Sequence, residues 1–362
     1  MKPRDGEPGN PSPVCYRTAV VHKADNDFSL YFPARDGVIR ADWVTFRARI
    51  KTPPGGSMFE DVTNYLIAGG LLAGLLYGLV ARHFDLDMMQ AVRNVFREAS
   101  HRQLLAVAAA MLVAVVGTGW LELSDTVDVA SAGYRNGQFD WLGVLLGGLL
   151  FGIGASLGGQ DAARVFVNAA GGDLRALLVL GIFIIFATIT QFGLLEPVRL
   201  WLTGVSAIHL GSGDAGLASV FGLPGWLAVL IVAGALAVYI ALRWKRGGEV
   251  PLLVAGGIIG LIVVASWYVT GVLAFDMFNP KAPSGITASG PMSRIGMLVV
   301  AGDTPRLSYA VSFVIGLAAI GFVYSLLRGQ FRFTPIPGGK LGSSILGAAL
   351  MGIGATVAYG CN

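Results

Sequence analysis

The sequence predicts an all-α, polytopic integral membrane protein with duplicated, pseudo-symmetric halves and re-entrant or broken helices. Three observations predict this fold. The 362 residues are 54% hydrophobic and only 13% charged, and they include 51 glycines, a balance typical of membrane proteins rather than soluble domains. Eight apolar runs are each close to the ~20 residues that a helix needs to span a bilayer. A glycine-rich pattern also occurs twice, far apart in the chain.

The eight apolar runs define the membrane part of the chain. None shows the alternation of apolar and polar residues, over segments of about ten, that is typical of transmembrane β-strands. We therefore expect all of them to be helical. They cover residues 65–81, 104–121, 141–157, 176–195, 226–242, 251–275, 309–327 and 341–359.

Basic residues predict the orientation of these spans. The links after the first, third, fifth and seventh runs contain Arg82, Arg93, Arg97, Arg102, Arg164, Arg175, Arg243, Lys245, Arg246, Arg328, Arg332 and Lys340. The links after the second, fourth and sixth runs contain only Arg135, Arg199, Lys281, Arg294 and Arg306. By the positive-inside rule, the first set faces the cytoplasm and the first span starts from outside.

The chain divides into three predicted parts, which are residues 1–57, a first membrane half at 58–200 and a second at 201–362. The first part is polar, carries proline clusters at its ends and lacks the apolar core of a signal peptide. Alternating residues at 27–32 and 38–44 predict a short hairpin. A disordered or mis-annotated extension fits equally well, because Met58 stands directly before the membrane part.

Three links have recognisable patterns. Residues 82–97 alternate apolar and charged side chains at helical spacing, which predicts a short helix that re-enters or lies at the cytoplasmic interface. In the link 162–175, Asp173 follows two glycines and is expected to cap the next span. Residues 278–291 are rich in proline and polar side chains and predict a long outer loop that links two helices or shapes an entrance.

The repeated pattern covers residues 142–161 and 341–361, and these copies end on Asp161 and Cys361. Either copy alone is explained by small residues that let membrane helices pack closely. Two copies with matched polar ends favour helices broken inside the membrane, whose tips line an ion path. The odd number of spans from one copy to the other predicts opposite orientations, and we expect the tips to meet near the midplane.

Several function classes find no support in the sequence. Cys15 and Cys361 are the only cysteines, and the four histidines are scattered, so neither a disulfide framework nor a metal site is predicted. Nucleotide-binding fingerprints and nucleophile–base constellations are not visible either. We therefore predict no cofactor, no enzymatic activity and no nucleic-acid partner.

Three stretches of the sequence resemble the YeeE/YedE family of sulfur-compound transporters. They are residues 147–180, 87–96 and the ending MGIGATVAYGCN, and the resemblance extends from Met58 to the end. It implies an hourglass-like protein of the bacterial inner membrane that passes thiosulfate or a related small sulfur anion inward through the lipid bilayer. Family members pass the anion along constriction cysteines by weak thiol hydrogen bonds. A small soluble cytoplasmic sulfur-carrier protein is the partner that the resemblance implies.

The chain departs from the family pattern where the family usually has cysteine. Asp87 and Asp161 occupy two such positions, and only Cys361 keeps the thiol. The family also usually continues beyond Asn362, so the chain is expected to be truncated. The predicted pathway residues are Asp87, Asp161, Cys361, Gly152, Gly154, Gly352, Gly354, Gln160 and Asn362.

The two aspartates leave three readings open. If ionised, they would repel a dianion by several kcal/mol at an effective dielectric constant of about 20. If they stay protonated, they donate hydrogen bonds as a thiol does. In that case we expect anion uptake to fall as pH rises. Asn at these positions should support uptake better than Glu, and cysteine at both positions should keep or raise uptake. They could equally mark a path for a cation or proton, or a membrane-anchored interaction protein that has lost transport.

Overall fold

The computed structural model describes residues 20–24, 27–34, 37–42, 56–98, 100–133, 135, 138–209, 216–244, 249–275, 282–301 and 308–360. The chain forms two compact units, Met1–Glu60 and Asp61–Asn362.

The first unit contains a small antiparallel sheet of three strands. These are β1 (Val20–Ala24), β2 (Asp27–Ala34) and β3 (Gly37–Asp42), in the order β1-β2-β3. Tyr31 pairs with Val20 on one side and with Arg40 on the other. The structure contains the predicted hairpin as β2 and β3, and it adds β1 as a third strand.

The second unit is an all-α bundle, as predicted. Within the described residues, eight helical segments are long and apolar enough to cross a membrane, and each matches one predicted span. Their principal helices are α2 (Gly56–His83), α4 (Arg102–Leu123), α5 (Trp141–Gly158), α7 (Leu174–Phe192), α10 (Gly225–Arg243), α11 (Val250–Tyr268), α13 (Tyr309–Leu327) and α14 (Leu341–Val357).

Shorter helices lie between the spans. They are α3 (Met88–Glu98), α6 (Ala162–Ala170), α8 (Glu196–Ser206), α9 (Leu217–Phe221) and α12 (Ser289–Ala301). The π-helical turn η2 (Val269–Leu273) extends α11, and β4 (Gln138–Asp140) pairs with β5 (Ala207–His209). The short helix predicted in 82–97 is α3. The link 162–175 contains α6. Of the predicted outer loop 278–291, residues 278–281 lie outside the described residues, and α12 begins at Ser289.

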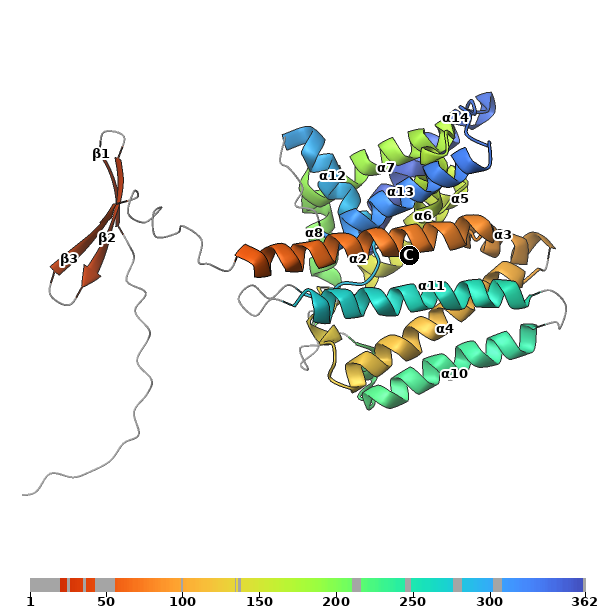
Figure 1. Ribbon diagram of the computed structural model, residues 1–362, viewed down its shortest axis with the longest axis horizontal. Helices are drawn as coiled ribbons and strands as arrows, with labels where there is room; N and C mark the ends of the chain where they lie inside the picture. Colours follow the sequence, from red (N-terminus) through yellow and green to blue (C-terminus); the bar gives the residue numbers. More distant parts are fainter. Residues whose placement is uncertain are drawn as a thin grey trace, which may run out of the picture. The chain divides into compact units, whose positions relative to one another are not determined.

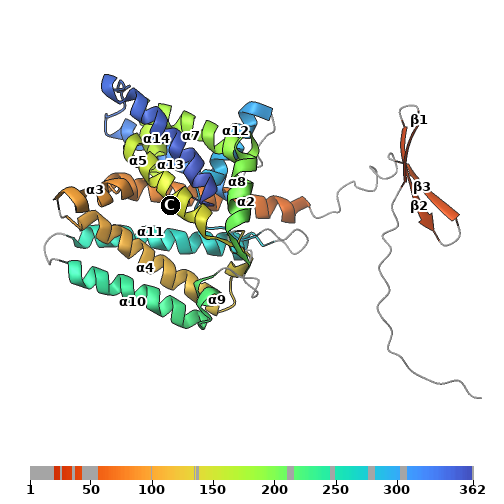
Figure 2. The ribbon, with the colours of Figure 1, turned by 180° about the vertical axis from the view of Figure 1, so that it is seen from behind.

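The spans are arranged in two groups (Figures 1 and 2). In one group, α4 packs between α10 and α11. In the other, α14 packs against both α5 and α7, and α6 packs against α13. The main core lies in this second group, where Phe183, Phe313, Leu317 and Met351 are almost fully buried.

The repeat glycines form the contact between α5 and α14. A Cβ atom added at Gly154 would lie 2.6 Å from the carbonyl oxygen of Gly347, and one added at Gly354 would lie 2.5 Å from that of Gly147. Residues late in one helix therefore face residues early in the other, so α5 and α14 run antiparallel. Side chains at these positions would prevent this approach, which explains why glycine stands there.

This overlap corrects the expectation that the two tips meet. Gly158 at the end of α5 lies against Gly347, whereas Ala358 just beyond α14 lies against Gly147. An antiparallel pair that overlaps along its length places its two C-terminal ends at opposite ends. Cys361 and Asn362 themselves lie outside the described residues. The duplication of the two halves stays a prediction.

Two substitutions on α5 test the glycine contact. Gly154→Ala places a methyl group against the α14 backbone, and we expect the unfolding midpoint of the detergent-purified protein to fall, with overpacking costing about 1–3 kcal/mol. Gly152→Ala is the matched control, because nothing lies within 4 Å of a Cβ atom there. Alanine is the better helix former by about 1 kcal/mol, so this variant should be as stable as the parent. Equal midpoints for both variants would contradict the contact.

Candidate functional site at two helix N-termini

Asp161 connects the N-termini of two short helices. It is the N-cap of α6, where its Oδ1 accepts a hydrogen bond from the backbone N–H of Arg164 at 2.8 Å. Its Oδ2 accepts from the backbone N–H of Met88, the first residue of α3, at 3.1 Å. One carboxylate therefore satisfies N–H groups that the first turns of both helices would otherwise leave without partners.

Asp87 lies beside this junction, immediately before α3. Its Oδ1 accepts hydrogen bonds from the backbone N–H groups of Met89 at 2.8 Å and Gln90 at 3.1 Å. Its Oδ2 is buried and has no hydrogen-bond partner among the described residues. The residue as a whole is only 3% exposed and Asp161 only 8%. The structure thus brings together the two aspartates that the sequence singled out, although they are far apart in the chain.

Arg164 supplies the positive charge at this junction. Its guanidinium forms an ion pair with Asp85 and approaches Asp87, with 3.5 Å between Nη1 and Oδ2. The side chain of Asp85 is 64% exposed, whereas that of Asp87 is 1% exposed. One cation is therefore shared between an exposed and a buried carboxylate. In the sequence, Arg164 is visible only as a basic residue in a link, and no pattern indicates this role.

Polar side chains continue from the aspartates along α6. Asn168 Nδ2 donates to Gln160 Oε1 at 2.9 Å, and Gln160 Nε2 donates to Asp173 Oδ2 at 3.3 Å. Arg82 at the end of α2 donates to Asn168 Oδ1 at 3.1 Å. Asp173 is also the N-cap of α7, as predicted. Gln160 thus lies in a network that joins α2, α6 and α7.

The four predicted pathway glycines divide into three environments. Gly154 and Gly354 lie at the α5–α14 contact. Gly352 faces Phe183 and Ala187 of α7, whereas Gly152 has open space around it. These glycines therefore do not gather at the aspartates. Their role in the structure is helix packing, except at Gly152, where no close approach requires a glycine.

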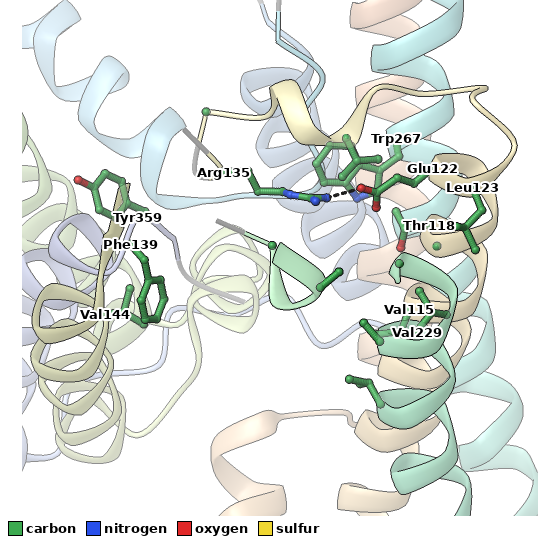
Figure 3. A pocket seen from close by; sticks show the side chains of 18 of the residues that line it. Val115, Thr118, Glu122, Leu123, Arg135, Phe139, Val144, Val229, Trp267 and Tyr359 are labelled. Atoms are coloured by element: carbon green, nitrogen blue, oxygen red, sulfur yellow. Dashed lines mark hydrogen bonds and ion pairs between the residues drawn. The ribbon is translucent and has the colours of Figure 1, made fainter. Parts of the chain in front are cut away.

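A second polar region lies at the other end of α5. A cavity of about 760 Å³ is lined there by Arg135, Glu122, Trp267, Asp140 and Tyr359, among others. Figure 3 shows Arg135 paired with Glu122, at 2.8 Å between Nη1 and Oε1, on the side opposite Tyr359. Tyr359 donates to Asp140 Oδ2 at 2.8 Å. No pattern in the sequence indicated this cavity.

Substitution of Arg164 tests the pairing of its charge with the buried carboxylate of Asp87. Arg164→Met removes the cation beside the buried carboxylate of Asp87, and breaking a buried ion pair in this way costs about 3–5 kcal/mol. We expect a clear fall in the unfolding midpoint, and we expect the double variant Arg164→Met/Asp87→Asn to recover part of it. The exposed Arg97 of α3 provides the control Arg97→Met, which should change little. If the double variant unfolds at the same midpoint as Arg164→Met, the assumed pairing of Arg164 with Asp87 is wrong.

The model of a family described as "Sulphur transport" matches residues 85–362. A protein of Escherichia coli K12 named thiosulfate transporter TsuA is 25% identical over 317 residues, which cover 82% of this chain and 85% of that protein. A protein of Spirochaeta thermophila with the same name is 24% identical over 328 residues, covering 82% of this chain and 89% of that one.

Proposed function

Because the chain belongs to the sulphur transport family, we propose that it transports thiosulfate, or a small anion of the same kind, across a membrane. The family match over residues 85–362 is the observation on which this proposal rests. It includes both aspartates, the α5–α14 pair and the links between them. Two relatives named as thiosulfate transporters, each matched over most of its own length, support the same substrate.

The junction of α3 and α6 is the proposed passage site. The N-terminus of a helix has a partial positive charge and attracts anions, and two such ends point toward Asp87 and Asp161. The guanidinium of Arg164 adds a full positive charge beside them. A small anion that reaches this junction meets three sources of positive potential within one buried region.

The two carboxylates modify this anion site. In the described arrangement they accept four backbone hydrogen bonds that an anion could otherwise receive. This supports acceptor roles for Asp87 and Asp161, in contrast to a cysteine thiol, which donates. The passing anion must therefore displace these bonds or meet a carboxyl group whose charge has been neutralised.

The proposal also covers the side of the membrane that the site faces and its protein partner. The site is expected to face the cytoplasm of a bacterial cell, because the basic links lie at this end of the spans. A soluble sulfur-carrier protein is the proposed recipient of the anion there. Arg93 and Arg97 on α3 give this mouth a positive surface that suits an acidic partner.

Uptake in cells that lack other thiosulfate transporters tests the function. We expect cells that produce the chain to accumulate labelled thiosulfate, and we expect Asp87→Cys/Asp161→Cys to keep or raise that uptake because it removes two negative charges from the passage. Asp161→Glu should transport less than Asp161→Asn, because the longer side chain crowds the junction and retains the charge. Gly354→Leu, whose side chain would meet the α5 backbone, is expected to be inactive and serves as the negative control. Absence of uptake by the parent chain would favour a membrane interaction protein without transport.

A further inference from the structure

We propose that the link between α13 and α14, residues 328–340, binds an anionic phospholipid at the membrane surface where α13 ends. The proposal holds whichever solute the protein transports, because it depends only on α13 being a membrane span. Three features of the link support it, which are a row of stacked phenylalanine rings, a positive charge without acidic neighbours, and a fixed backbone.

The phenylalanine row consists of Phe322, Phe331 and Phe333, and it connects the side of α13 with the link. Phe322 lies within the span and is 45% exposed, so lipid tails cover its ring in a bilayer. The rings of Phe331 and Phe322 meet edge-on with 5.4 Å between their centroids, and those of Phe333 and Phe331 with 5.7 Å. Phe322 precedes the end of α13 at Leu327 by about 7 Å along the helix axis. The row therefore starts among acyl chains and leads out to Phe333, which is 70% exposed.

Basic side chains accompany the phenylalanine row. Arg328, Arg332 and Lys340 are all exposed, and residues 304–362 contain no aspartate or glutamate. Within the described part of the chain, these three side chains form no ion pair with a carboxylate. Arg328 instead lies over the ring of Tyr324, with 5.4 Å between Cζ and the ring centroid. Basic residues that directly follow a span attract anionic lipid headgroups.

The backbone of the link is held against the turn between α6 and α7. The N–H of Thr334 donates to the carbonyl of Gly172 at 3.1 Å, and the N–H of Leu174 donates to the carbonyl of Thr334 at 3.3 Å. A Cβ atom added at Gly172, where φ is +96°, would lie 2.7 Å from the carbonyl oxygen of Arg332. The link is thus ordered before a ligand arrives, which lowers the entropy cost of binding.

An anionic lipid suits this surface better than an acidic protein does. A soluble protein approaches the end of the bundle from water and does not reach Phe322 inside the span. A phospholipid supplies both an acyl chain for the phenylalanine row and a phosphate for Arg328 and Arg332. Arginine binds phosphate through paired, charge-assisted hydrogen bonds, and its aliphatic stem packs along apolar surface.

Lipid titration of the purified full chain in a neutral detergent, followed by native mass spectrometry, tests the binding. We expect the parent chain to bind phosphatidylglycerol more tightly than phosphatidylcholine. Arg328→Gln/Arg332→Gln should weaken phosphatidylglycerol binding about 25-fold, or about fivefold for each arginine, because one cation near an anionic surface contributes about 1 kcal/mol. Arg243→Gln is the matched control and should retain the parent's affinity, because Arg243 is exposed at the end of α10, in the other group of helices.

Vesicles of phosphatidylcholine and phosphatidylglycerol test the position of the phenylalanine row. Phe333→Cys is labelled with a fluorophore, and quenching by lipids that carry a nitroxide near the headgroup is compared with quenching by iodide in water. Ile315→Cys is the reference, because Ile315 lies inside α13 and is exposed. The parent chain, labelled at Cys15 and Cys361, gives the background. We expect the lipid nitroxide to quench the label at 333 strongly and iodide to quench it little.

The opposite results would overturn the proposal. Equal affinity of the parent chain for the two lipids would do so, as would an unchanged affinity in Arg328→Gln/Arg332→Gln. Competition by glycerol phosphate, which is the headgroup without acyl chains, would indicate a site for free anions in place of lipid. Strong iodide quenching at 333 without lipid quenching would place this surface in water, where an acidic protein is the better partner. If the double variant does not fold, Arg332→Gln alone serves, with a loss of about fivefold expected.

Discussion

The close contact between α5 and α14 is the constraint on which the rest of the membrane unit depends. Lipid tails are as apolar as helix surfaces, so helices in a bilayer gain little from burying apolar side chains against one another. Their association depends instead on close packing and on polar contacts. Gly147, Gly154, Gly347 and Gly354 allow the two backbones to approach directly. The pair then provides a fixed axis against which α7 packs.

Polar contacts fasten this pair at both ends. At one end, Arg175 at the start of α7 donates to the carbonyl of Leu157 and to Ser344 Oγ. At the other end, Tyr359 donates to Asp140. The chain leaves α5 through Gly159, whose φ of +82° is accessible mainly to glycine, and so turns directly into Asp161. The position of Asp161, and with it the α3–α6 junction, follows from the orientation of α5.

The sequence predicted the spans well because each is a long apolar run bounded by charged links. Asp161 was singled out because a polar residue after glycines at the end of an apolar segment is costly without a function, and Asp87 because the resemblance places it at a family cysteine position. Their role in transport stays a proposal. The sequence did not predict which residues contact these side chains. Asp161 receives a hydrogen bond from Met88, which is 73 positions earlier, and no local pattern encodes such a contact. Arg164 was visible only as a basic residue in a link.

The shorter helices and the meeting of the tips were harder to predict for different physical reasons. Helices α6 and α12 are too short to be recognised by length, and they are ordered by burial against α7 and α13. The expectation that the tips meet followed the behaviour of broken helices in duplicated transporters. It failed because α5 and α14 overlap from Gly147 to Gly158 and from Gly347 to Ala358, which the sequence repeat alone does not specify.

The antiparallel overlap of α5 and α14 has a kinetic consequence. On the proposed transport path along this pair, a solute would pass the α3–α6 junction and the region of Asp140 and Tyr359 at separate times, because these lie at opposite ends of the pair. The two regions would then act as resistances in series. The slower of the two sets the overall flux, while the discrimination between solutes at one region multiplies the discrimination at the other. A substitution that relaxes selectivity at one end therefore leaves the barrier at the far end in place.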